Sequence, residues 1–125
     1  MLNDKNPLYW LEIANHDIQT VKILLRENGY ADIIIYHMHQ AIEKKLKSNI
    51  VNFKKDFPFI HDLKRLLINL SELDKKYNEI ENEIIILHSF YVNLRYPQSE
   101  NINQNDLILA KESFEKILIF FEISF

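Results

Sequence analysis

The chain has 125 residues, of which 47% are hydrophobic, and a formal net charge of −3. This length predicts a single domain over residues 1–125, and the hydrophobic fraction is sufficient for a core without disulfides. Because the chain contains no cysteine, it excludes a disulfide framework, a thiol nucleophile and a thiolate metal site.

The beginning of the chain and its apolar runs bear on location. Residues 1–6 contain no apolar segment of the kind that a signal peptide needs. The longest apolar runs, at residues 33–36 and 117–121, are far too short to span a bilayer. We therefore expect a cytoplasmic protein that does not associate with a membrane.

One glycine and three prolines indicate long helices with short connections. Asn6 as N-cap and Pro7 at the first position predict the start of the first helix, and Gly29 is its expected C-cap. The apolar residues of this helix recur at spacings of three and four: Leu11, Ala14, Ile18, Val21 and Leu25. A second helix is predicted from about Tyr30 to Val51, followed by a loop over residues 52–59.

The second half of the chain continues in the same way. A third helix is predicted from about His61 to Leu70, and a fourth follows Asp74 and ends before Pro97. Residues 98–105 read as a polar loop, and Asn105 is the expected N-cap of a fifth helix. Sustained 3,4 spacing predicts an all-α fold, an up-and-down antiparallel bundle of four to five helices.

Three segments carry more apolar surface than one core requires. They are the β-branched runs at 33–35 and 84–86 and the C-terminal residues 117–125. Excess apolar surface on a small bundle is typical of a subunit interface. We therefore expect a dimer, either of identical or of different chains.

A row of polar residues adjoins the apolar stripe of the second helix. His39, Glu43 and Lys47 recur at i, i+4 and i+8, and Gln40 and Lys44 occupy the next row. Such an edge is where a bundle builds a site or meets a partner. Glu43 and Lys47 also make an ordinary helix salt pair, and spacing alone favours this second interpretation.

Several types of chemistry lack their motif. One glycine cannot form a phosphate-binding loop, and no His-Glu-x-x-His is present. His37 and His39 diverge on a helix, so no metal and no other cofactor is expected. The basic stretch over residues 44–65 is compatible with phosphate binding, but such a run is more often a solvated helix face.

Four short islands are more informative together than singly. They are Trp10-Leu11-x-x-Ala14-x-x-Asp17, His39-Gln40-Ala41-x-Glu43-Lys44-x-Leu46-Lys47, Phe57-Pro58-x-x-His61-Asp62-Leu63 and Leu94-Arg95-Tyr96-Pro97. In this order, and on these predicted helices, they resemble the HEPN domain family over essentially the whole chain. The resemblance implies a helical bundle, often dimeric. Many members act with a minimal nucleotidyltransferase, typically as a toxin–antitoxin pair, and others are proposed to bind nucleotide.

The ribonuclease branch of that family carries an arginine followed, four to six residues on, by a histidine. No histidine follows Arg95 in this chain, so the motif is missing. No catalytic residue is therefore assigned, and a ribonuclease would have to use Arg95 with His39 or His61.

The islands define a candidate cleft for a nucleotide, an RNA phosphate or a partner. Its predicted members are His39, Gln40, Glu43, Lys44, Lys47, His61, Asp62, Arg95 and Tyr96. Arg95 presents a planar fork that suits phosphate, or it forms an ion pair with Glu43 or Asp62. Asp62 opens the third helix, where it either adjoins an anion site or caps the terminus.

Three functions stay open from the sequence. The first is a non-catalytic HEPN subunit that dimerises, partners a small nucleotidyltransferase and binds nucleotide in the cleft. The second is a divergent endoribonuclease toxin that acts on RNA. The third is a structural helical adaptor whose polar islands are internal ion pairs.

Overall fold

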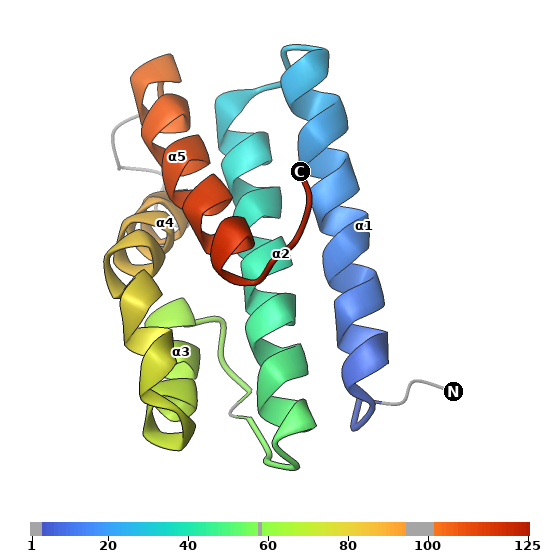
Figure 1. The fold of residues 1–125 in the computed structure, drawn as a ribbon. Helices are drawn as coiled ribbons and strands as arrows, with labels where there is room; N and C mark the ends of the chain where they lie inside the picture. The colour runs from blue at the N-terminus through green and yellow to red at the C-terminus, as the bar shows by residue number, and fades with distance from the viewer. Residues whose placement is uncertain (1–3, 58, 95–101) are drawn as a thin grey trace.

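The computed structural model describes residues 4–57, 59–94 and 102–125, and all the regular structure in these ranges is helical (Figure 1). The elements are α1 (Pro7–Arg26), α2 (Ala31–Asn52), α3 (Leu63–Leu73), the 3-10 helix η1 (Lys75–Ile80), α4 (Glu81–Leu94) and α5 (Gln104–Phe120). The prediction of an all-α bundle of four to five helices is confirmed, with five α-helices in the described ranges.

Helix α2 is the centre of the bundle. It packs beside α1 as a long antiparallel hairpin and also contacts α3, α4 and α5 (Figure 1). The α3–η1–α4 segment forms a second hairpin on the other side of α2. Because α2 contacts the other four helices, side chains on different faces of α2 meet different partners.

Asn6 is confirmed as the N-cap of α1, and of the two alternatives left open for Asp62 the structure shows the cap of α3. The Asn6 side chain accepts a hydrogen bond from the backbone N–H of Leu8 at 3.0 Å, with Pro7 as the first helical residue. Asp62 Oδ1 accepts from the N–H groups of Lys64 and Arg65 at 2.9 and 3.2 Å. These side chains satisfy N–H groups that have no partner within the helix, which fixes where α1 and α3 begin.

The prediction that Gly29 caps the first helix is wrong by one residue. Asn28 takes the left-handed conformation, with φ at 55°, and the Gly29 N–H then donates to the Leu24 carbonyl at 2.7 Å. Asparagine tolerates this conformation because its short polar side chain bonds locally. Helices α2 and α5 end in the same way at Lys54 and Glu122, with φ at 59° and 58°.

Two helix starts also differ from the prediction. Asn103, not Asn105, caps α5, because Asp106 three residues later completes a reciprocal capping box with it. The fourth helix begins with η1, and α4 itself starts only at Glu81. Tyr77 in η1 is buried and accepts a hydrogen bond from Asn49 of α2 at 2.7 Å.

The apolar C-terminal residues fold back on the bundle instead of extending its surface. The ring of Phe125 packs edge-on against Phe114, which is fully buried, and Tyr77 stacks on Phe120. Much of the apolar surplus of residues 117–125 is therefore used inside this chain. None of the helices in the described ranges is long and apolar enough to cross a membrane.

Candidate functional site

A buried ion cluster centres on Glu43 of α2. Its Oε2 accepts from Lys47 Nζ at 3.2 Å, and its Oε1 lies 3.0 Å from His61 Nδ1. Glu43 and Lys47 are buried, whereas the His61 side chain is 61% exposed. The predicted Glu43–Lys47 helix pair is confirmed, and the loop before α3 adds a histidine that helical spacing could not predict.

Two aromatic rings surround the Lys47 ammonium group. Its Nζ lies 5.3 Å from the ring centre of Trp10 on α1 and 5.0 Å from that of Phe57 in the α2–α3 loop. The two rings contact each other edge to face at 5.3 Å. Cation–π attraction is strongest where water is excluded, so the rings help to hold a charge that burial disfavours.

A second group of polar residues lies where α3 meets α4. His88 Nε2 of α4 lies 3.5 Å from Asp62 Oδ1, the oxygen that also caps α3. Burial lowers the pKa of His88, with Asp62 acting against this shift and Lys64 adding to it. Asp62 therefore serves the cap and the α3–α4 contact at once.

His39 lies beneath this group, with none of its surface exposed. Its ring stacks on Tyr91 at 3.7 Å between centres, and neither ring nitrogen has a hydrogen-bond partner among the described residues. Burial first, and then the nearby His88 and His61, lower the pKa of His39 to about 3; Lys47 adds to the shift and the His61 backbone opposes it. His39 is thus a neutral core ring, and in this conformation it cannot touch a ligand.

Lys44 belongs to a different polar group. Its Nζ donates to Asp17 Oδ2 of α1 at 2.5 Å, and His37 Nδ1 lies 3.1 Å from Asp17 Oδ1. This group joins α1 to α2 on a different face of α2 from Glu43. Gln40 is half-buried on α2, and the predicted site residues Arg95 and Tyr96 lie outside the described residues.

The predicted cleft residues that the structure describes therefore do not form one open groove. Glu43, Lys47 and His61 come together, with His39 and Asp62 close by, but Glu43, Lys47 and His39 are buried, and the exposed side chains are those of His61 and, in part, Asp62. The structure separates Lys44 from the rest because residues 43 and 44 point about 100° apart on a helix.

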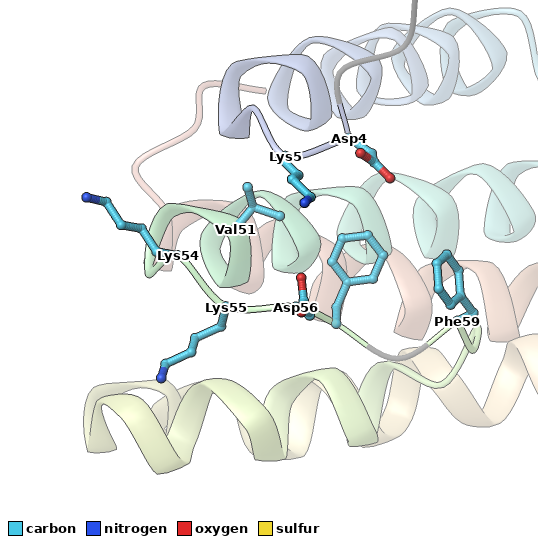
Figure 2. Close-up of a pocket in the computed structure, with 8 residues that line it drawn as sticks. Asp4, Lys5, Val51, Lys54, Lys55, Asp56 and Phe59 are labelled. Carbon is cyan, nitrogen blue, oxygen red and sulfur yellow. The ribbon is translucent and has the colours of Figure 1, made fainter.

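A pocket of about 500 Å³ adjoins the ion cluster (Figure 2). Its lining residues are Asp4, Lys5, Val51, Lys54, Lys55, Asp56, Phe57 and Phe59. Lys5 and Asp56 point toward one another across it, and the Phe59 ring, 94% exposed, stands at one side (Figure 2). Since Phe57 both lines this pocket and covers Lys47, the pocket and the ion cluster share a wall.

The family model described as the HEPN domain matches residues 8–123, which is nearly the whole chain. The chain is a HEPN domain. Neither the curated proteins nor the solved structures contain a significant match to it.

Within this HEPN domain, three of the four islands that carry the resemblance meet in space. Trp10 comes from the first island, Glu43 and Lys47 from the second, and Phe57 and His61 from the third. The fourth island begins at Leu94 and otherwise lies outside the described residues.

Sequence reasoning did not include Trp10, Asp17 or Phe57 among the site residues. Each makes a contact that only the tertiary fold brings about: Trp10 and Phe57 with Lys47, and Asp17 with Lys44. One feature of the sequence could have pointed to these three residues: all of them lie within the islands that resemble the HEPN family. An aromatic residue looks like core in a sequence, so its role beside a buried amine is not visible there.

Proposed function

We propose that this HEPN domain is a non-catalytic subunit that pairs with a small nucleotidyltransferase, as in a toxin–antitoxin pair, and also dimerises. The observation that carries the proposal is the meeting of three islands around Glu43, Lys47 and His61. In this proposal, the exposed side of that cluster and the adjoining pocket contact the partner and its nucleotide.

Physical cost supports a role beyond stability for the ion cluster. Taking a carboxylate and an amine out of water is expensive, and well-packed apolar residues of similar volume are often equally or more stabilising. Glu43 and Lys47 are both buried, yet each keeps a polar or aromatic partner from another segment. A fold that needed only a bundle core would gain little from this arrangement.

The pocket has the chemistry to accept a nucleotide. Its volume of about 500 Å³ falls within the range of small-molecule sites. Lys5 points an amine into the pocket for phosphate, and Lys54 and Lys55, whose amines point outward in Figure 2, add positive charge at its edge. The exposed Phe59 ring supplies a surface on which a base stacks. Asp4 and Asp56 reduce the positive charge and would disfavour long polyanions relative to a mononucleotide.

Two measurements test the proposal. Under this proposal the neighbouring gene encodes a small nucleotidyltransferase, and co-purification of the chain with that gene's product should give a complex that survives gel filtration. Thermal unfolding with ATP should show stabilisation, about 2.7 kcal/mol when ATP is ~100-fold above its dissociation constant. Phe59→Ala and Lys54→Ala should reduce the ATP effect, whereas Lys116→Ala, an exposed lysine on α5, should not.

The outcomes separate the two parts of the proposal. Absence of a complex would refute the partnership. A stabilisation by ATP that is equal in Phe59→Ala, Lys54→Ala and wild type would refute the pocket.

A second function is favoured by one specific observation. Glu43 fixes His61 through Nδ1, and the His61 side chain is 61% exposed. A carboxylate that orients an exposed imidazole is the arrangement used for general acid–base catalysis. A divergent endoribonuclease would use this pair to move the proton of the attacking 2′-hydroxyl.

Expression in a bacterial host separates this alternative from the first proposal. An endoribonuclease should inhibit growth and cleave RNA in vitro, and His61→Ala should abolish both effects. His16→Ala, which removes an exposed histidine of α1, is the matched control. Harmless expression with intact RNA would refute the alternative.

A further inference from the structure

The α3–η1–α4 hairpin carries an apolar groove on its outer side. The groove has a volume of about 320 Å³, and the buried residues Leu67 and Ile84 form its floor. Ile68 of α3 and Ile85 of α4 also line it and are 46% and 42% exposed. Isoleucines this exposed, side by side on two packed helices, make a contiguous apolar surface, which is typical of an interface.

A further exposed apolar residue lies beyond the groove on α4. Val92 lies seven residues, or two helical turns, after Ile85 and is also exposed. His88 and the exposed Ser89 lie between them on this face, so the apolar surface of the groove itself ends near Ile85.

The two ends of the groove carry opposite charges. Lys64 lies at the start of α3 and influences His88 in the second half of α4. Glu72, near the end of α3, and Glu81, at the start of α4, line the opposite end. Since Lys64, Ile68 and Glu72 are four residues apart, they form a line along α3, with about 12 Å between its charged ends.

We propose that a second copy of this chain docks on this groove, hairpin against hairpin, about a two-fold axis that passes near Ile68 and Ile85. A two-fold axis places the same patch on both subunits, so the patch must complement itself. Here the axis places the two isoleucine pairs against each other and brings Lys64 opposite Glu72 of the partner subunit, twice. The inference deepens the dimer of the proposed function by assigning its surface.

Charge selects a second copy over other occupants. The carboxylates of Glu72 and Glu81 repel a nucleic acid at one end of the groove. A partner must place a negative charge opposite Lys64, a positive charge opposite Glu72 and apolar residues between them. A second copy related by a two-fold axis presents this pattern, whereas an unrelated protein would have to have it independently. The groove also shares no lining residue with the pocket beside the ion cluster.

Analytical ultracentrifugation over a range of concentrations tests this assignment. We expect a wild-type dimer and a monomeric Ile68→Glu variant; because Ile68 is exposed, its replacement opens no core cavity. Lys64→Glu and Glu72→Lys should each weaken the dimer by about tenfold or more, since each creates two like-charge contacts. The double variant Lys64→Glu/Glu72→Lys should regain most of the wild-type affinity, and Lys116→Glu on α5 should leave it unchanged.

Three results would overturn the assignment. They are a wild-type protein that stays monomeric at every concentration, a dimer that tolerates Ile68→Glu, and charge reversals that are not rescued by exchange. Co-purification of each variant with the nucleotidyltransferase separates this outcome from failure of the proposed function. Loss of that complex in Ile68→Glu, with the dimer intact, would assign the groove to the other protein and refute the two-fold contact.

Discussion

His39 should make this domain sensitive to acid. In the unfolded chain a histidine takes up a proton near pH 6.5, whereas burial and the neighbouring histidines lower the pKa of His39 in the folded protein to about 3. Between these two values the unfolded state binds one more proton than the folded state. The stabilising effect of the neutral ring is therefore complete above about pH 6.5 and decreases as the pH falls toward 3.

The magnitude follows from the two pKa values of His39. At about pH 4.5 the proton favours the unfolded state by RT ln(1 + 10²), or about 2.7 kcal/mol, and above pH 7 the effect is close to zero. His39→Phe removes the titrating group but keeps a ring to stack on Tyr91. The free-energy difference between His39→Phe and wild type should therefore shift in favour of the variant by about 2.7 kcal/mol on acidification.

Urea denaturation at a series of pH values, followed by circular dichroism, measures this shift. Other groups also titrate, so the comparison is between the variant and wild type at each pH. His16→Phe, at an exposed position on α1, controls for the loss of an imidazole from the surface. If the unfolding free energies of His39→Phe and wild type differ by the same amount from pH 7 down to about 4.5, the account of His39 as a buried neutral ring is refuted.

Three further predictions concern single contacts. Lys47→Met should lower the unfolding free energy measured in urea by about 3 kcal/mol, because the buried Glu43 loses a partner. The double variant Lys47→Met/Glu43→Gln should regain most of this free energy, and a double variant as unstable as the single one would contradict the ion-pair account. Asp62→Ala removes the cap of α3 and should lower stability in thermal unfolding by about 1 kcal/mol. Asp62→Asn keeps a capping oxygen, so a loss of stability as large as in Asp62→Ala would show that the negative charge, and not the cap, is what stabilises. Glu122→Gly should raise the free energy of unfolding by about 1 kcal/mol, since glycine takes the φ of 58° without strain. A Glu122→Gly variant less stable than Glu122→Ala would contradict this.

Local patterns were sufficient for most of the helices. The side chains of Asn6 and Asp62 act on N–H groups two or three residues away, so the starts of α1 and α3 follow from short segments. The 3,4 spacing of apolar residues reflects the helical repeat itself, and it predicted the bundle. The same locality explains the confirmed Glu43–Lys47 pair, whose partners are four residues apart.

The errors at helix ends also have local causes, but they require competing signals to be weighed. Glycine is the usual residue at the left-handed end of a helix, yet Asn28 precedes Gly29 and takes that position. Asn103 and Asn105 both have a capping side chain, and only Asp106 at the third helical position favours the earlier one. Such choices depend on small energy differences between neighbouring residues.

The sequence by itself determined the helical bundle, the absence of any thiol chemistry and the membership of the islands in one family. The tertiary structure alone decided how the polar residues are grouped. His61 contacts Glu43, which is 18 residues away in the sequence, and Asp17 accepts a hydrogen bond from Lys44, which is 27 residues away. Neighbours such as Glu43 and Lys44 point in different directions on α2, and packing against four other helices gives each direction a different partner. Burial follows from the same packing, which is why His39, polar in the sequence, became a core ring while His61 stayed at the surface.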